Sequence, residues 1–89
     1  MTSSTTARFR RAFAVLPEHI QRRARQAYRQ FQNDPAHPSL RFKQVHSTRP
    51  IYSARVGLGY RALAVRDGDA LIWFWIGTHA DYDRMLRDL

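Results

Sequence analysis

The chain is predicted to fold as an α+β domain, in which an N-terminal helical hairpin packs on a small antiparallel β-sheet and a short helix follows. Three observations predict this. Apolar residues in the first third recur at helical spacing, and three later segments have the apolar pattern of strands. The turns between those segments are too short for crossovers, so the sheet is expected to be a three-stranded meander with room for one more short strand. The length of 89 residues suits a single domain over 1–89.

The first third carries the pattern of two helices joined near Pro17. Residues 1–6 are expected to be loose, and residues 2–6 are a polar run in which Thr5 or Thr6 can cap the first helix. That helix has its apolar residues at Phe9, Phe13 and Leu16. Proline suits the first turn of a second helix. The apolar stripe of this second helix is Ile20, Ala24, Ala27, Tyr28 and Phe31. Asn33-Asp34-Pro35 is expected to end it.

The middle of the chain carries the pattern of strands. Arg41–His46 is expected to be a short extended piece. Ile51–Val56 and Tyr60–Arg66 alternate between apolar and other residues and are predicted to be two strands joined by a turn at 57–59. Asp67-Gly68-Asp69 is a typical hairpin turn and leads into the third strand.

The third strand and the last helix complete the fold. Ala70–Ile76 is apolar throughout, which favours a strand buried on both faces, with Trp73 and Trp75 as core residues rather than base-stacking platforms. Gly77 is expected to end the strand, and Thr78 is expected to cap a helix. The apolar stripe of that helix is Tyr82, Met85, Leu86 and Leu89.

The amino-acid composition limits which partners and which cellular location are expected. Fifteen basic residues against seven acidic ones give a net charge of +8, which favours a polyanionic partner: nucleic acid, an acidic protein or an anionic membrane. The chain has no cysteine, which excludes disulfides and thiolate metal sites and predicts a cytoplasmic location. The apolar run 12–16 is too short for an export signal, and no stretch is long enough to span a membrane.

A candidate site lies where the predicted strand ends meet. Arg55 comes late in one strand and Arg61 early in the next, so these positions are neighbours. His79 and Tyr82 follow the third strand three residues apart, and Lys43 lies just upstream of the meander. If alternate residues of the first strand pack on the helices, Arg55 points to the other, partly open face. The face of Arg61 depends on the register of the turn, which the sequence does not fix.

Such a cationic site with an imidazole suits RNA cleavage through the 2′-hydroxyl. That reaction needs a base, cations for the charge on phosphorus and an acid for the leaving oxygen, and histidine exchanges protons near neutrality. No metal or other cofactor is expected, because the four histidines lack ligand spacing.

Plainer interpretations stand beside this one. In these interpretations the role of His79 is to start a helix, and Tyr82 is a core residue. Arg55 and Arg61 are then either solvated or bind an acidic partner. The arginine face of the second helix is either RNA-binding or a solvated face. Its residues are Arg22, Arg25 and Arg29.

Taken together, these segments resemble the RelE/ParE toxin superfamily of type II toxin–antitoxin systems. The most specific parts are Gly59-Tyr60-Arg61, which opens a strand, and the ending Ile76-Gly77-Thr78-His79 with Tyr82 three residues on. The resemblance runs over residues 8–86. It also includes Leu16-Pro17, Asn33-Asp34-Pro35, Tyr52-Ser53-Ala54-Arg55-Val56 and Trp73-Phe74-Trp75.

The resemblance implies a fold and a set of roles. The family fold is a helical hairpin on a small antiparallel sheet, and members without a leading strand fit the polar residues 2–6. Arg61 matches the strand arginine that contacts the scissile phosphate in the RNase branch, and Arg55 falls where a basic residue often precedes it. Lys43 falls near a basic position upstream of these strands. His79 falls at a position that holds His or Arg in different members, and Tyr82 resembles the C-terminal tyrosine.

Three functions follow as hypotheses. The first is a toxin that inhibits translation as a ribosome-dependent mRNA endoribonuclease, or mRNA interferase. The second is a ParE-type inhibitor of DNA gyrase. It stays open because the chain lacks the dense lysine cluster of the RNase branch and has no glutamate near the site, since its only glutamate is Glu18 on the second helix. The third is a non-catalytic basic module that binds RNA or protein. For either toxin the expected partner is an acidic protein antitoxin, in a hetero-oligomer, with opposite charge speeding association; no membrane partner is expected.

Overall fold

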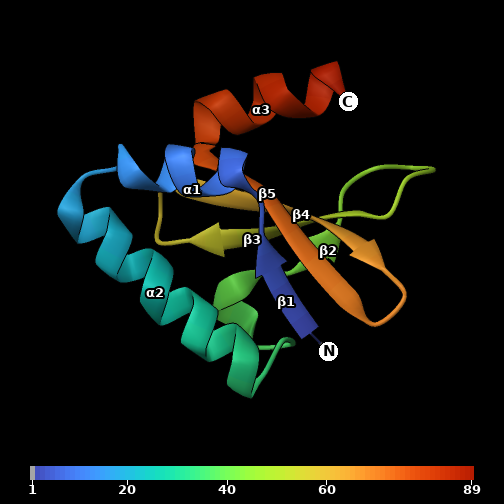
Figure 1. Ribbon diagram of the computed structural model, residues 1–89, viewed down its shortest axis with the longest axis horizontal. Helices are drawn as coiled ribbons and strands as arrows, with labels where there is room; N and C mark the ends of the chain where they lie inside the picture. The colour runs from blue at the N-terminus through green and yellow to red at the C-terminus, as the bar shows by residue number, and fades with distance from the viewer. Residues whose placement is uncertain (1) are drawn as a thin grey trace.

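The computed structural model describes residues 2–89 and contains one mixed sheet with three α-helices (Figure 1). The elements in chain order are β1 (Thr2–Thr5), α1 (Ala7–Ala14), α2 (Glu18–Asn33), a 3-10 turn (Pro38–Leu40), β2 (Lys43–Gln44), β3 (Ile51–Val56), β4 (Tyr60–Asp67), β5 (Ala70–Thr78) and α3 (His79–Asp88). The five strands lie in the order β1-β5-β4-β3-β2. The predicted α+β class is confirmed, with five strands where three or four were expected.

The leading residues form a strand rather than a loose segment. β1 pairs in parallel with β5, from Thr2 opposite Ala70 to Thr5 opposite Trp73. The indole Nε1 of Trp73 donates a hydrogen bond of 2.9 Å to Oγ of Ser3, a residue 70 positions away. The prediction of a loose start, and of a member without a leading strand, is therefore wrong for residues 2–5, while Met1 lies outside the described residues. A short Ser/Thr run has no apolar pattern, and its backbone pairing depends on a distant strand.

The predicted meander is confirmed in β3, β4 and β5, which are antiparallel neighbours. Each hairpin turn contains a glycine with positive φ, Gly57 at 62° and Gly68 at 58°, a conformation that other residues adopt only with strain. β2 is the short extended piece expected within 41–46 and forms one edge of the sheet. β5 continues past the predicted end at Gly77 to Thr78.

The helix caps agree with the prediction. The Thr6 hydroxyl accepts a hydrogen bond from the Phe9 amide at 3.1 Å, and the Thr78 hydroxyl accepts one from the Asp81 amide at 3.2 Å. α2 begins after Pro17 and ends at Asn33. No helix within residues 2–89 is long and apolar enough to cross a membrane.

The sheet has a core on each face. α1 lies against β5 and α2 against β3, and together they cover one face, called here the hairpin face. The other face, called here the α3 face, is partly covered by α3, which packs there in a core separate from that of the hairpin face. Its buried residues are Ile51, Leu63, Trp75 and Tyr82. The face expected to be open is therefore shared between a small core and polar side chains.

A β-bulge in β5 divides the two tryptophans between these cores. Leu63 pairs with Trp75 while the next residue, Ala64, pairs with Trp73, so Phe74 is the extra residue. Strict alternation would place Trp73 and Trp75 on one face, but the bulge reverses the alternation. Trp73 is 5% exposed in the core of the hairpin face, and Trp75 is 9% exposed in the core of the α3 face. Both are core residues, as predicted.

Candidate functional site

The register of the turn at Gly57 places Arg55 directly opposite Arg61. Arg61 and Leu63 are alternate residues of β4, and Leu63 packs in the core of the α3 face. Both arginines therefore belong to the α3 face, which answers the question that the sequence left open. Like charges on directly opposed strand residues repel and destabilise the sheet. This end of the sheet concentrates positive charge at the expense of stability, which suits an anionic ligand.

Tyr82 of α3 is the centre of the cluster. Its side chain is buried, at 7% exposure, and its hydroxyl donates a hydrogen bond of 3.4 Å to Oγ of Ser53. The Arg61 guanidinium lies 6.0 Å from the centroid of the Tyr82 ring. The His79 ring stacks on the Tyr82 ring with 5.7 Å between centroids and 28° between planes. Tyr82 is therefore a core residue, as one of the two interpretations predicted, and its ring also contacts the side chains of two predicted site residues.

His79 presents an accessible imidazole at the edge of this cluster. It is the first residue of α3, and its backbone amide donates a hydrogen bond of 2.8 Å to the Gly59 carbonyl, which ties the helix start to the β3–β4 turn. The side chain is 52% exposed, and Nε2 lies 3.9 Å from a carboxylate oxygen of Asp83. An exposed imidazole beside a half-exposed carboxylate can exchange protons with a ligand bound over Arg61.

Lys43 and Arg55 flank the cluster. Lys43 of β2 is paired with Ser53 of β3 and is exposed. Arg55 is partly buried, and its Nε donates a hydrogen bond of 2.9 Å to the Gly57 carbonyl, so its side chain bends toward the turn. The structure thus joins Arg61, His79 and Tyr82 by direct contact and places Lys43 and Arg55 in adjacent rows of the sheet.

Two features of the cluster were not predicted from the sequence. Ser53, which is 2% exposed, is the hydrogen-bond partner of Tyr82. Gly77 lies opposite Arg61, and a Cβ atom built on it would stand 2.5 Å from Cζ2 of Trp75. The indole of Trp75 therefore occupies the space beside Gly77. The signals were the serine on the α3 face of β3 and a glycine within an otherwise bulky strand.

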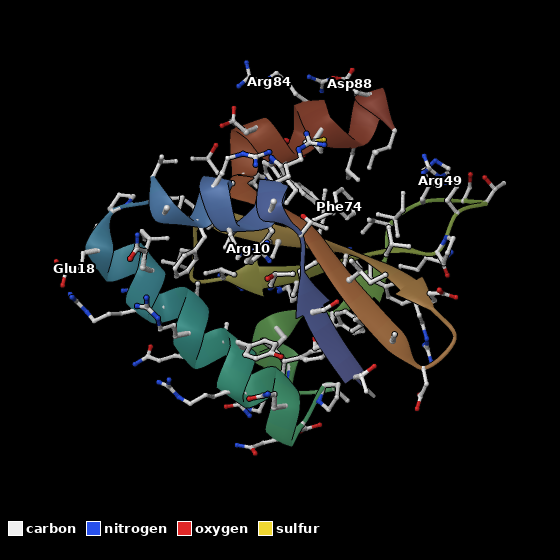
Figure 2. All side chains as sticks on the ribbon, in the orientation of Figure 1. Arg10, Glu18, Arg49, Phe74, Arg84 and Asp88 are labelled. Atoms are coloured by element: carbon white, nitrogen blue, oxygen red, sulfur yellow. The ribbon has the colours of Figure 1, made fainter. Side chains whose placement is uncertain are left out.

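The arginine face of α2 lies elsewhere, because α2 covers the hairpin face of the sheet. Arg22 pairs with Glu18 across 3.2 Å at the surface, where Glu18 projects outward (Figure 2). The Arg25 guanidinium lies 5.1 Å from the centre of the Phe13 ring, and Arg25 and Arg29 line a cavity. These arginines form a second basic surface, separated from Arg61 by the sheet.

Two further features define the electrostatics. The pKa of the Asp81 carboxyl is held below its ordinary value of 3.8, first by a hydrogen bond from Arg84 and second by one from Thr78. Arg84 projects from the outer side of α3 (Figure 2). Within residues 2–89 no group of three or more His, Asp and Glu side chains is placed to hold a metal ion.

Comparisons with known proteins agree with this architecture. A family model described as the ParE-like toxin domain matches residues 18–84. A chain of the RelB–RelE antitoxin–toxin complex from Methanococcus jannaschii is 23% identical, with a TM-score of 0.71 and coverage of 90% of this chain and 95% of that chain. YafQ from E. coli strain BL21(DE3) is 12% identical, with a TM-score of 0.72 and coverage of 90% and 94%.

The toxin–antitoxin complex RelBE2 from Mycobacterium tuberculosis contains a chain that is 22% identical, with a TM-score of 0.69 and coverage of 88% of this chain and 96% of that chain. These likenesses show the fold. No curated protein sequence matches the chain.

Proposed function

The chain belongs to the ParE-like toxin domain family, and from this premise we propose that it is the toxin of a type II toxin–antitoxin pair and acts as a ribosome-dependent mRNA endoribonuclease. The observation that carries the enzymatic part is the stack of Arg61, Tyr82 and His79 on one sheet face. An acidic protein antitoxin is its partner, in keeping with the antitoxin–toxin complexes among the similar structures.

The reaction assigned to this site needs no metal. A base removes the proton of a ribose 2′-hydroxyl, and the oxygen attacks the adjacent phosphorus. The bond from phosphorus to the 5′-oxygen breaks, and that oxygen takes up a proton. The products are a 2′,3′-cyclic phosphate and a 5′-hydroxyl.

Each contact in the site supports one part of that chemistry. Arg61 supplies permanent positive charge for the non-bridging oxygens, and its planar guanidinium matches phosphate geometry. Arg55 is its partner in the strand ladder and adds a second positive charge at this end of the sheet. The exposed imidazole of His79 exchanges protons with the ribose or the leaving oxygen. Tyr82 holds both side chains in position through its ring and is itself fixed by Ser53.

The test is to express the wild type and Arg61→Ala from a tightly controlled promoter and to map mRNA 5′ ends within minutes of induction. We expect new cuts within translated codons for the wild type and none for Arg61→Ala. Arg87→Ala, which removes an exposed arginine from the last turn of α3, is the matched control and should cut like the wild type. Growth arrest with intact mRNA would contradict the RNase proposal.

A second candidate function is inhibition of DNA gyrase. It is favoured by the match to a ParE-like family model. It is also favoured by the absence of a glutamate from the candidate site, because Glu18, the only glutamate in the sequence, lies at the start of α2 on the other side of the sheet. A gyrase inhibitor would leave mRNA intact while DNA breaks and the SOS response appear. A basic binding module without toxicity would produce neither cuts nor growth arrest.

A further inference from the structure

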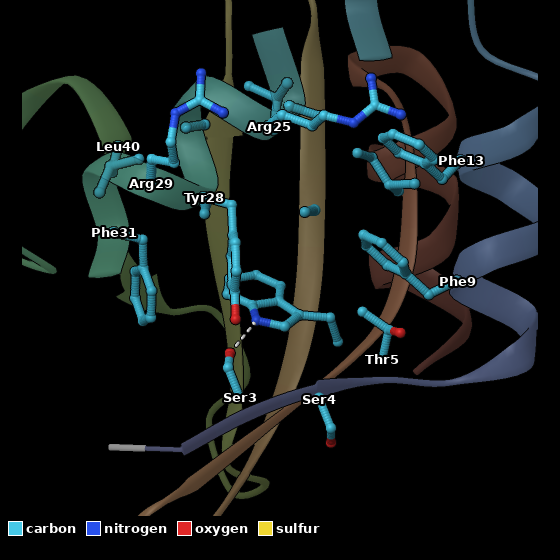
Figure 3. Close-up of a pocket in the computed structure, with 17 residues that line it drawn as sticks. Ser3, Ser4, Thr5, Phe9, Phe13, Arg25, Tyr28, Arg29, Phe31 and Leu40 are labelled. Atoms are coloured by element: carbon cyan, nitrogen blue, oxygen red, sulfur yellow. Dashed lines mark hydrogen bonds between the residues drawn. The ribbon is translucent and has the colours of Figure 1, made fainter. Parts of the chain in front are cut away.

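A pocket of about 540 Å³ opens between α2, the 3-10 turn and the turn that joins β3 to β4, and we call it the edge pocket. It is distinct from the apolar hollow between α1 and α2, around which Figure 3 shows Phe9, Phe13 and Tyr28. The edge pocket is lined largely by polar side chains, and no acidic residue is among them. The polar and charged lining residues are Arg23, Gln26, Gln30, Ser39 and Arg55.

Two arginines of this pocket meet at one glycine. The Nε atom of Arg55 donates a hydrogen bond of 2.9 Å to the Gly57 carbonyl. Arg23 of α2 lies against the same glycine, because a Cβ atom built on Gly57 would stand 3.2 Å from Nη1 of Arg23 and 3.3 Å from its Cδ. Neither arginine forms an ion pair with another residue in the described range 2–89. Two guanidinium groups beside one turn make a site for an anion, and their planar geometry matches phosphate oxygens.

The edge pocket is continuous with the candidate site through Arg55, which stands opposite Arg61 in the strand ladder. β2 pairs with β3 only at Tyr52 and Ser53, so in the described part of the chain no strand lies beside Arg55 at that edge of the sheet. A single strand of nucleic acid with one phosphate on Arg61 can therefore pass this open edge. It would place a neighbouring phosphate between Arg55 and Arg23.

The lining of the edge pocket suits the backbone of a nucleic acid rather than its bases. Proteins commonly hold unpaired bases by stacking them on aromatic rings, and none of the described residues that line this pocket is aromatic. The side-chain amides of Gln26 and Gln30 and the Ser39 hydroxyl can form hydrogen bonds with phosphate and sugar oxygens. Contacts of this kind position a strand without reading its sequence.

We propose that the edge pocket binds one ribose-phosphate unit of a single-stranded RNA substrate, beside the unit that is cleaved at Arg61, and that Arg23 and Arg55 hold its phosphate. The binding does not depend on the base. This inference rests on the RNA-directed part of the proposed function. An acidic peptide is the other ligand that two arginines would attract, and RNA is favoured because Arg55 borders both the pocket and the candidate site.

The test uses a hexanucleotide of uridine with 2′-O-methyl riboses, which has no 2′-hydroxyl group to attack phosphorus and cannot be cleaved. Its Kd for the full-length chain is measured by fluorescence anisotropy at several salt concentrations. Arg23→Gln removes one charge from the pocket, and Gln26→Trp fills it. The matched controls are Arg11→Gln and Gln32→Trp, which make the same changes at exposed helix residues outside the pocket. Circular dichroism checks that each variant is folded.

We expect Arg23→Gln to bind the probe about fivefold more weakly, the upper end for one exposed ion pair. The dependence of log affinity on log salt concentration should become shallower by about 0.7, the value for one lost phosphate contact with a single strand. Gln26→Trp should also bind more weakly, while both controls bind like the wild type. A hexanucleotide of adenosine should bind with an affinity similar to that of the uridine probe, because backbone contacts do not read the base.

Binding by Arg23→Gln that matches Arg11→Gln in affinity and salt dependence would overturn the proposal. So would equally tight, Arg23-dependent binding of inorganic phosphate or of a glutamate peptide with the charge of the probe, which would assign the pocket to a small anion or to an acidic protein. Intact cellular mRNA together with Arg23-dependent binding of the probe would overturn only the RNase function. New mRNA cuts by the wild type, with unchanged cutting and binding by Arg23→Gln, would overturn only the edge pocket.

Discussion

Arg55 and Arg61 stand directly opposite each other in the β3–β4 ladder, on the face that carries Tyr82. Each guanidinium also donates to a backbone carbonyl, that of Gly57 for Arg55 and that of Tyr60 for Arg61. Neither side chain forms an ion pair with a residue in the described range 2–89. An anion bound at this pair would therefore reduce the repulsion between the two positive charges.

The first prediction concerns this repulsion. Replacing Arg55 by Gln removes one charge of the pair. Added salt screens the repulsion between the two arginines, so the unfolding free energy of the wild type should rise with salt concentration. In the variant this rise should be smaller by about 0.2–1 kcal/mol. Urea unfolding at two salt concentrations measures it. Arg49→Gln removes the same charge from an exposed loop (Figure 2) and should change the salt dependence less. An equal effect at both positions would mean that the opposed geometry is unimportant.

The second prediction concerns His79. Its side chain is 52% exposed, so His79→Ala should change the unfolding free energy by no more than about 0.5 kcal/mol, as is usual for surface substitutions. The variant should nevertheless lose growth arrest upon induction. His19→Ala removes an exposed histidine from α2 and should remain toxic. A folded, fully toxic His79→Ala protein would exclude the imidazole from the mechanism.

The third prediction concerns the buried hydroxyl pair. In a double-mutant cycle, Ser53→Ala and Tyr82→Phe should be coupled by about 0.5 kcal/mol, the low end for a hydrogen bond because the oxygens are 3.4 Å apart. Urea unfolding of the two single variants and the double variant gives the coupling energy. Additive effects would show that the hydroxyls do not interact.

The fourth prediction concerns the glycine beside Arg61. Gly77→Ala should destabilise the fold by about 1–3 kcal/mol, because the new methyl group would meet the Trp75 ring at 2.5 Å in a packed core. Gly59→Ala is the matched control, since nothing lies within 4 Å of its Cβ position. Thermal unfolding compares the two, and a Gly77→Ala protein as stable as Gly59→Ala would show that the Trp75 ring moves freely.

The fifth prediction concerns the start of α3. Because the Arg84 and Thr78 hydrogen bonds lower the pKa of Asp81, the ionised carboxylate stabilises the folded state at pH values above its ordinary pKa of 3.8. That contribution is lost as the pH falls through the lower folded pKa. NMR titration should find the Asp81 pKa below 3.8, and Arg84→Ala should raise it. An unchanged pKa in that variant would remove Arg84 as the main cause.

The local parts of the fold could be predicted from sequence. Helical spacing identified α1 and α2, and the turns at Gly57 and Gly68 identified the meander. β1 could not be predicted, because a polar tetrapeptide gains its structure from a strand at the far end of the chain. The bulge in β5 could not be predicted from the sequence either, because it depends on how the two tryptophans are divided between the cores on the two faces of the sheet.

The candidate site was predicted in composition but not in geometry. Strand ends and helix spacing predict that Arg61, His79 and Tyr82 lie close together, and in the structure Arg61 and His79 both lie against the Tyr82 ring. The face of Arg61 depended on a turn register that the residues do not encode locally. Ser53 was missed because a buried hydroxyl is recognised only through its partner, 29 residues away.

The parallel pairing of β1 with β5 joins the first and last strands of the chain. Proteins are synthesised from the N-terminus, so β1 waits for its neighbour until β5 has left the ribosomal exit tunnel. α3, which carries His79 and Tyr82, follows β5 and emerges later still. The sheet and the site are therefore completed only after β5 and α3 have been synthesised, although β1 is made before them.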